Sequence, residues 1–308
     1  MKKPKICILY GGIGPERSVS LESGQAVIEA LRDESEFFAH DLTEAKVPGF
    51  IKPEETVVFP VLHGRFGEDG ELQAQLEDLG IEYCGCEAAS SELCIDKVRT
   101  KNIASSVGAH VAESLVFDAS EMPSFTECAQ RLGEKFVIKP SNEGSSVGLY
   151  IVEKESDYDL AQGNIQEGRW MAEQRVFGLE SSIGILHGKA QGVVAIRPEN
   201  GVYDYEHKYT AGGSTYEYPA CISDSLTKEI QTTTELIFGK CGCRDYARAD
   251  YIIDSNEKPV FLEINSLPGL TPTSLLPKSV SCNGLSFLEL LKTMLSPAVA
   301  RWTERYGK

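Results

Sequence analysis

Short apolar runs alternate with segments whose apolar residues recur every three or four positions along the first part of the chain. The short runs are typical of buried strands, and the longer spacing is typical of helices that bury one face. The pattern predicts, in order, strand 5–10, helix 18–32, strands 37–41 and 56–61, and helix 71–79. Strands that alternate with helices in this way favour an α/β fold, here about half of a doubly wound unit.

The rest of the chain continues the alternation with a larger share of strands. It predicts helices at 90–107, 124–132, 226–241 and 286–295, and strands at 135–139, 147–152, 169–173, 181–186 and 190–196. An irregular stretch at about 197–223 interrupts the pattern. A stretch of that length in a compact enzyme is usually a functional lid, which is our expectation here.

The amino-acid composition argues against two classes of binding partner, nucleic acids and membranes. The 308 residues suffice for two or three domains, and 30 Lys+Arg against 46 Asp+Glu give a net charge of −16. Such an acidic surface repels phosphate backbones and anionic lipids, so we expect no nucleic-acid and no membrane partner. No apolar run approaches the roughly 20 residues of a transmembrane helix, and the apolar stretch 6–10 is too short for a signal peptide.

The nine cysteines include two CxC pairs, Cys84/Cys86 and Cys241/Cys243, and no CxxC pair. Neither CxC pair is accompanied by a histidine cluster, so buried reduced thiols are favoured over a thiolate metal site. Free thiols in this number are typical of a reducing compartment, and we expect the protein in the cytoplasm.

Apolar runs on both sides of the turn at 255–258 predict a β-hairpin. A turn centred between residues 256 and 257 sets Asp250 opposite Glu263 and Arg248 opposite Asn265. Because side chains two apart on a strand share a face, one face presents all four groups. Oxygen ligands of this kind suit Mg²⁺ whose shell a nucleotide phosphate completes. The alternative is a solvated hairpin face with cross-strand charge pairs.

A predicted strand ends at Lys139 and runs into a loop rich in Gly and Ser at 140–148. Backbone N–H groups and hydroxyls of such a loop can approach phosphate oxygens while the lysine neutralises charge. The Walker spacing is absent, and a flexible turn is the alternative.

Two glycine-rich loops in the first part of the chain are further candidates. The loop 11–17 lacks the GxGxxG spacing, and its Glu16 suits a helix start as well as a ligand contact. His63 opens the loop 63–70 directly after a predicted buried strand, where α/β folds place ligand contacts. A tight turn is the alternative for that loop.

Seven motifs, spread over essentially the whole chain, resemble in order those of D-alanine–D-alanine ligases of the ATP-grasp superfamily. They are GGIGPERSVSLESG, HGRFGEDG, DK at 96–97, KPSNEGSSVG, YDYEHKY, RAD and LEINSLPG. The resemblance implies an N-terminal, doubly wound-like substrate domain at 1–95 and a central α+β domain at 96–177. A C-terminal ATP-grasp domain at 178–308 would carry the metal site and the lid, with ATP between the last two domains.

The resemblance also implies an activity. Two D-alanine molecules would be joined to D-alanyl-D-alanine through a D-alanyl phosphate, for peptidoglycan precursor synthesis, by a homodimer. Charge neutralisation and positioning dominate such chemistry, and the lid would keep water from the acyl phosphate.

The resemblance assigns the nucleotide and metal contacts residue by residue. The positions that match the family's ATP-binding residues are Lys97, Lys139, Ser146, Glu173, Glu180 and Lys208. Glu173 and Glu180 would lie on the adenine and ribose side, and Lys208 would reach the γ-phosphate. Asp250, Glu263 and Asn265 would bind two Mg²⁺ ions, with Mn²⁺ as a possible replacement.

The substrate contacts implied by the resemblance come from all parts of the chain. Those assigned to catalysis are Glu16, Ser145, Tyr209, Arg248 and Gly269, and those assigned to substrate binding are His63, Ser274 and Leu275. Glu16 would orient the first D-alanine's ammonium, with His63 nearby and with Ser145 and Tyr209 hydrogen-bonded to Glu16. Arg248 and the Gly269 backbone would stabilise oxyanion charge. Ser274 and Leu275 would receive the second carboxylate.

Two positions depart from the family pattern, and alternatives stay open. Gly14 stands where the family usually has serine, and Ser266 where threonine usually follows the metal-binding asparagine. A D-alanine–D-serine ligase is the main alternative. Tyr209 disfavours a D-lactate ligase, because ligases of that kind typically carry histidine at this position. A non-catalytic ATP-binding module is disfavoured because all four polar groups of the hairpin are present.

Overall fold

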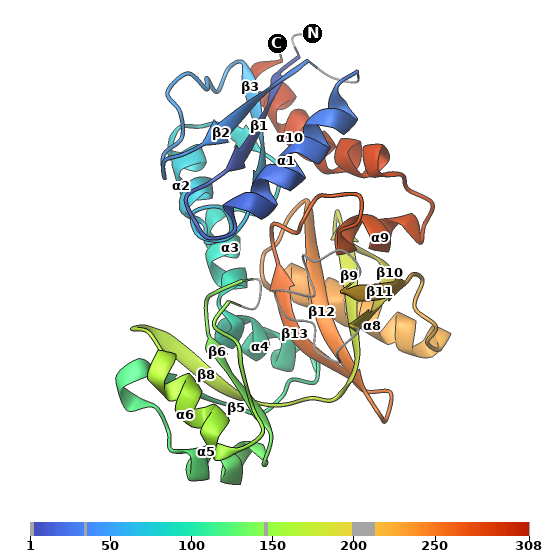
Figure 1. Ribbon diagram of the computed structural model, residues 1–308. Helices are drawn as coiled ribbons and strands as arrows, with labels where there is room; N and C mark the ends of the chain where they lie inside the picture. The colour runs from blue at the N-terminus through green and yellow to red at the C-terminus, as the bar shows by residue number, and fades with distance from the viewer. Residues whose placement is uncertain (1–2, 34–35, 145–146, 199–212, 308) are drawn as a thin grey trace.

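The computed structural model describes residues 3–33, 36–144, 147–198 and 213–307, which form three sheets with flanking helices (Figure 1). Residues 199–212, at the centre of the expected lid, lie outside this description. On either side of them the chain is strand rather than irregular coil, at the end of β10 (Lys189–Pro198) and in β11 (Ser214–Glu217). None of the helices in the described ranges combines the length and the apolarity needed to cross a membrane.

The first sheet is parallel, with strand order β2-β1-β3-β4. Its strands are β1 (Lys5–Gly11), β2 (Phe37–Leu42), β3 (Thr56–Leu62) and the short β4 (Glu82–Tyr83). Every residue of β3 is buried, as a central strand covered on both faces requires. Helices α1 (Arg17–Leu31) and α2 (Glu71–Asp78) agree with the sequence pattern.

The C-terminal helix α10 (Phe287–Tyr306) packs with α1 against this first sheet, and both termini of the chain lie there (Figure 1). The helix is longer than predicted, because it continues through Pro297 to Tyr306. A proline inside a helix removes one N–H donor, and here the buried side chains of Ala298 and Trp302 hold the second half in place.

The second sheet is antiparallel, with order β5-β8-β6-β7. It contains β5 (Ser114–Asp118), β6 (Phe136–Pro140), β7 (Tyr150–Val152) and β8 (Arg169–Gln174). A short 3₁₀ turn η1 (Ala119–Glu121) and helices α5 (Phe125–Leu132) and α6 (Glu155–Asn164) accompany it. The sequence pattern missed β5 and α6, because α6 buries only Tyr158 and Ala161 and β5 only Phe117.

The third sheet is antiparallel, with order β11-β10-β9-β12-β13. It adds β9 (Gly178–Leu186), β12 (Tyr246–Asp254) and β13 (Pro259–Asn265), and helix α8 (Asp224–Lys240) covers one face together with α4 (Lys97–Ser106). Helix α9 (Leu275–Ser281), which the pattern also missed, packs on β9 and β10. A Cβ on Gly184 would lie 2.5 Å from Leu276 Cδ1, so glycine allows this close approach.

The single helix predicted at 90–107 is two helices, α3 (Ala88–Ile95) and α4. Asp96 breaks them apart, because its backbone is extended and its carboxylate accepts the N–H groups of Val98 and Arg99. This is an N-terminal cap, which starts α4 at Lys97. The break therefore places Lys97 at the first position of α4.

Candidate active site

A cavity of about 860 Å³ is lined by residues from all three sheets and their loops. Every predicted site residue that the structure describes lines it. These are Glu16, His63, Lys97, Lys139, Glu173, Glu180, Arg248, Asp250, Glu263, Asn265, Gly269, Ser274 and Leu275. The other four, Ser145, Ser146, Lys208 and Tyr209, lie outside the described residues, and their assignments stay predictions.

The hairpin of β12 and β13 has the predicted register, with Arg248 opposite Asn265 and Asp250 opposite Glu263. The register shifts by one residue only beyond Asp250, toward the turn. All four side chains line the cavity, and we call them the hairpin face. The hairpin face is therefore not merely a solvated surface.

Asp250 is held by two neighbours on the hairpin face side of the sheet. Arg248 donates from Nε and Nη2 to the two carboxylate oxygens at 3.0 and 2.8 Å. The hydroxyl of Ser182 on β9 donates to Asp250 Oδ1 at 2.6 Å. A bidentate pair of this kind fixes the carboxylate's orientation, so Asp250 is positioned before any ligand arrives.

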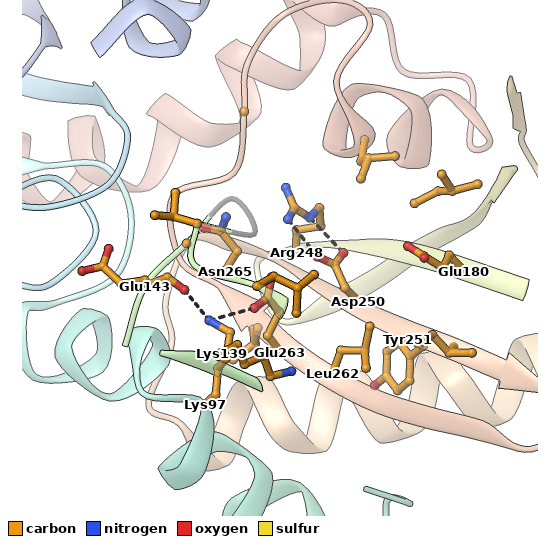
Figure 2. Close-up of a pocket in the computed structure, with 18 of the residues that line it drawn as sticks. Lys97, Lys139, Glu143, Glu180, Arg248, Asp250, Tyr251, Leu262, Glu263 and Asn265 are labelled. Atoms are coloured by element: carbon orange, nitrogen blue, oxygen red, sulfur yellow. Dashed lines mark hydrogen bonds and ion pairs between the residues drawn. The ribbon is translucent and has the colours of Figure 1, made fainter. Parts of the chain in front are cut away.

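Lys97 connects the hairpin face with the loop after β6 (Figure 2). Its Nζ lies 3.2 Å from Glu263 Oε2 and also donates to the backbone carbonyl of Glu143. The lysine is 8 % exposed and lines the cavity, so its ammonium group faces the cavity rather than bulk solvent. Glu263 therefore already has a cationic partner, so a cation at this carboxylate would compete with Lys97, and an anion at Lys97 would compete with Glu263.

Glu173 on β8 lies between two lysines, Lys139 on β6 and Lys101 on α4, and we call the three the buried ion triad. Lys139 Nζ is 2.6 Å from Glu173 Oε2, Lys101 contacts Oε1, and Lys101 also donates to the Phe261 carbonyl at 3.2 Å. Burial acts to raise the pKa of Glu173, but the two ammonium groups outweigh it and hold that pKa below its ordinary value. Burial lowers the pKa of Lys101 despite the neighbouring carboxylate.

Lys101 is a site residue that sequence reasoning missed. It follows Lys97 by one helical turn on α4, so both ammonium groups leave the same face of the helix. The spacing of four residues between the two lysines, after a capping aspartate, was the only feature of the sequence that could have pointed to Lys101.

Glu16 and His63 both line the cavity at the carboxyl end of the first sheet. His63 Nδ1 lies 3.2 Å from Glu68 Oε1, and its Nε2 lies 3.3 Å from the Ser23 hydroxyl. A Cβ on Gly64, whose φ is +72°, would lie 3.0 Å from Glu16 Oε1. Glu16 precedes α1 without making a capping hydrogen bond, so its buried carboxylate is not a helix cap. Ser23 and Glu68 were missed by the sequence analysis.

The start of α9 lines the opposite part of the cavity. Ser274 Oγ accepts from Thr271 N at 3.1 Å, and a Cβ on Gly269 would lie 3.1 Å from that same oxygen. One turn along, Lys278 is 8 % exposed, and burial lowers its pKa. Its Nζ lies 4.4 Å from the centre of the Tyr216 ring, and no carboxylate of the described residues forms an ion pair with it. Sequence reasoning missed Lys278 too.

The two departures from the family pattern leave the site intact. A Cβ on Gly14 would meet only Arg65 N, at 3.8 Å, so the position has room for a side chain. Ser266 is buried and lines the cavity next to Asn265.

Comparison with known proteins identifies the family. A family model described as the D-ala D-ala ligase N-terminus matches residues 39–86, and one described as the D-ala D-ala ligase C-terminus matches residues 103–296. The D-alanine--D-alanine ligase of Anaeromyxobacter sp. (strain K) is 36% identical over 96% of this chain and 97% of its own length. This chain belongs to the D-alanine–D-alanine ligase family. The family member of Nitrosomonas europaea is 38% identical over 94% of this chain and 96% of its own.

Solved structures agree with the family assignment. The D-alanine--D-alanine ligase from Bacillus anthracis complexed with ATP has a TM-score of 0.83 at 26% identity, covering 98% of this chain and 99% of that one. The VanG D-Ala:D-Ser ligase from Enterococcus faecalis has a TM-score of 0.82 at 28% identity, covering 96% and 100%. The expected α/β fold of the ATP-grasp type is confirmed, as is membership of an enzyme family.

Proposed function

We propose that this D-alanine–D-alanine ligase family member joins two D-alanine molecules to D-alanyl-D-alanine for peptidoglycan precursors, with ATP converted to ADP and phosphate. The observation that carries the proposal is the hairpin face inside a cavity that also contains Lys97 and Lys139. Carboxylates facing ammonium groups form a site for a phosphate and its counter-ions, which is what activation of a carboxylate by ATP requires. The ATP-bound relative from Bacillus anthracis supports the same nucleotide.

The nucleotide would lie between the second and third sheets. Lys97 and Lys139 would face its phosphates, because both ammonium groups line the cavity beside the hairpin face. Glu180 on β9 lines the cavity beside the apolar side chains of Val137, Ile151 and Leu262, which suit a planar base above a ribose hydroxyl contact. For Ser146 and Lys208 the resemblance alone supports a phosphate contact.

The hairpin face fits Mg²⁺, or Mn²⁺, by the chemistry of its donors. Asp250, Glu263 and Asn265 offer two carboxylates and an amide, which are hard oxygen ligands, from adjacent strands of one cavity wall. Two ions held there would neutralise the phosphate oxygens and polarise the transferred group. Asn265 Oδ1 accepts from Leu267 N at 2.8 Å, which fixes the amide oxygen's direction.

The first D-alanine would bind near Glu16 and His63, and its carboxylate would take the γ-phosphoryl group of ATP to give D-alanyl phosphate. Glu16 would hold the ammonium, and His63 is held in place by Glu68 and Ser23. The resemblance alone supports a hydrogen-bonded group of Ser145 and Tyr209 with Glu16. If Glu16 holds the ammonium of the first D-alanine, away from the ATP phosphates, the carboxylate of that D-alanine is the group that faces ATP.

The second D-alanine would attack the carbonyl of D-alanyl phosphate with its amine, and phosphate would leave. Arg248 and the backbone at Gly269 would stabilise the oxyanion of the tetrahedral intermediate, since both line the cavity beside the start of α9. The acceptor's carboxylate would lie at Ser274 and Leu275, with Lys278, one turn further along α9, as a candidate cation.

The family resemblance supports a homodimer, and sedimentation velocity would test this oligomeric state.

All nine cysteines are free, which supports a reducing compartment and hence the cytoplasm.

The deciding experiment measures phosphate release from ATP and Mg²⁺ with D-alanine alone, and then with D-serine or D-lactate in competition, with products weighed by mass spectrometry. D-Alanyl-D-alanine as the main product supports the proposal. A mainly mixed D-alanyl-D-serine product would instead support a D-serine ligase like the Enterococcus faecalis relative. Nucleotide binding without turnover of any D-amino acid would contradict both.

A further inference from the structure

The two CxC pairs of the sequence contribute to one cluster of thiols that the ligase chemistry does not use. Cys86 lies just before α3, Cys94 is on α3, Cys241 ends α8 and Cys243 lies in the turn before β12. We call these four the thiol cluster. The Sγ atoms of Cys94 and Cys243 are 3.4 Å apart, although the two residues are 149 positions apart in the chain.

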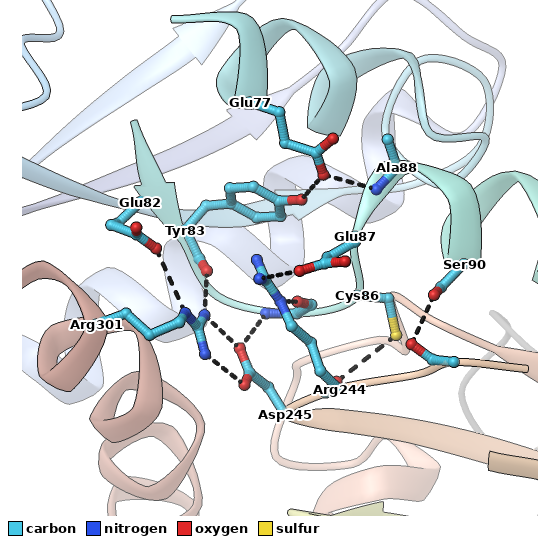
Figure 3. Close-up of polar contacts among 12 residues, drawn as sticks. Glu77, Glu82, Tyr83, Cys86, Glu87, Ala88, Ser90, Arg244, Asp245 and Arg301 are labelled. Carbon is cyan, nitrogen blue, oxygen red and sulfur yellow. Dashed lines mark hydrogen bonds and ion pairs between the residues drawn. The ribbon is translucent and has the colours of Figure 1, made fainter. Parts of the chain in front are cut away.

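Polar contacts hold the segments of the thiol cluster against each other (Figure 3). Ser90 Oγ donates to the Gly242 carbonyl at 2.6 Å. Arg244 donates from Nε to the Gly85 carbonyl and from Nη1 to Glu87 Oε1, each at 2.8 Å. The short distance between the sulfurs is therefore fixed by the fold on both sides and does not depend on the thiols themselves.

The thiol cluster is within reach of small molecules. Cys94 lines the active-site cavity, and Cys243 is partly exposed. Hydrogen bonding to Cys241, together with burial, raises the pKa of both Cys94 and Cys243, so the pair is present as thiols at neutral pH and its oxidation should become faster as the pH rises. No group of three or more His, Cys, Asp or Glu among the described residues has the arrangement of a metal site, which favours redox chemistry over metal binding.

We propose that Cys94 and Cys243 form a reversible oxidation site, which a hydroperoxide converts into a disulfide. One thiol of the pair first loses its proton to solvent, and the resulting thiolate attacks the peroxide, so that an S–O bond forms, the O–O bond breaks and hydroxide leaves and takes up a proton. The second thiol then attacks the sulfenic sulfur, an S–S bond forms, the S–O bond breaks and water leaves. In sum, two thiols and one hydrogen peroxide give one disulfide and two waters, and a dithiol reverses the oxidation.

The disulfide would act on the nucleotide site through α3. An S–S bond is about 2.05 Å long, so oxidation draws the two sulfurs together by more than an ångström. Cys94 is three residues before Lys97, whose ammonium contacts Glu263, and the strain would pass along this short segment. We expect the KM for ATP to rise severalfold on oxidation and to recover with dithiothreitol.

Peptide mapping of the full-length protein tests the bond directly. After treatment with hydrogen peroxide and alkylation, cleavage with trypsin and a Glu-specific protease releases Cys94 in peptide 93–97 and Cys243 in peptide 241–244. Cys84 and Cys86 then leave in peptide 83–87, so they cannot be confused with Cys94. We expect a linked species of 93–97 with 241–244, lighter by two hydrogen atoms, with fragmentation placing the bond at Cys243 and not at Cys241.

Two variants provide the controls. Cys243→Ser should abolish the linked species and the KM shift, whereas Cys221→Ser, which removes an exposed thiol elsewhere, should leave both unchanged. Absence of the linked species from oxidised wild type, a bond at Cys241, or a stoichiometric zinc ion lost together with the Cys243 thiol would overturn the proposal. The mapping needs no turnover, so its result stands whether or not the proposed ligase activity is found.

Discussion

The buried ion triad gives the sharpest prediction, that Lys101→Met destabilises the protein and disturbs the nucleotide site. Methionine keeps most of the lysine's length, so packing of the side-chain stem is largely retained. The change removes one of the two cations that neutralise Glu173, a carboxylate that is 2 % exposed. It also removes the hydrogen bond to the Phe261 carbonyl, which links α4 to the hairpin of β12 and β13.

The size of the effect follows from the burial of the group. Removing one partner of a buried ion pair costs about 3–5 kcal/mol, because the other charge is left buried and unpaired. Lys139 still contacts Glu173 at 2.6 Å, so we expect a loss at the lower end of this range, about 3 kcal/mol. Both Glu173 oxygens would then compete for Lys139. This would draw Lys139 away from the proposed phosphate site, and we expect the KM for ATP to rise.

The pH dependence provides a second check. The folded-state pKa of Glu173 lies below its ordinary value, so the triad stabilises the fold at neutral pH and this stabilisation is lost as the pH falls through the folded-state pKa. Below that pH, wild type carries two buried cations beside a neutral acid. The penalty of Lys101→Met should therefore be largest near pH 7 and should shrink in acid.

Urea unfolding at neutral and acidic pH measures both effects, and fluorescence of Trp170 on β8, the strand of Glu173, reports on the sheet concerned. The matched control is Lys135→Met, which breaks an exposed pair with Glu153 and should change the unfolding free energy far less. A loss below about 1 kcal/mol at pH 7 for Lys101→Met, or a penalty that grows in acid, would refute the assignment of a buried, charged triad.

Three further predictions address two residues of the cavity and one contact of α10 outside it. Glu263→Gln should abolish ATP turnover while the thermal unfolding curve stays close to wild type, and residual turnover would remove Glu263 from the metal site. Lys278→Met should raise the KM for the acceptor D-alanine about tenfold or more, as loss of a charged hydrogen bond does, with the KM for ATP unchanged in steady-state assays. Asp245→Asn weakens a bidentate contact with Arg301 of α10, at 2.9 Å on each side, and calorimetry should find a loss of about 2–4 kcal/mol.

The hairpin face could be predicted from the sequence because its geometry is local. Once the turn at 255–258 is placed, the two-residue repeat of a strand decides that Asp250 and Glu263 share a face and stand opposite each other. The shift in register beyond Asp250 did not disturb the prediction, since it lies on the turn side of the functional residues. Local rules of this kind hold wherever a site is built within one supersecondary unit.

The contacts between units could not be predicted in the same way. Lys101 on α4 meets Glu173 on β8, and Cys94 on α3 meets Cys243 just before β12, through contacts between segments that are far apart in the chain. No periodicity along the chain encodes that meeting. The break at Asp96 shows the limit most clearly, since a capping aspartate inside an apparently continuous helical pattern divides one predicted helix into two.

Three carboxylates that line the cavity, Asp250, Glu263 and Glu173, each already have a cationic partner in the structure. Arg248 holds Asp250, Lys97 holds Glu263, and the two lysines of the buried ion triad hold Glu173. Without these partners, clustered carboxylates at this burial would repel one another or take up protons.

The ammonium of Lys97 can pair with Glu263 or with a phosphate, but it cannot pair fully with both. Under the proposed function, a nucleotide arriving with its metal ions would exchange these partners, because a metal ion would replace the lysine at the carboxylate and a phosphate would receive the lysine. Each exchange would retain the charge balance, so we expect metal and nucleotide to bind together rather than separately.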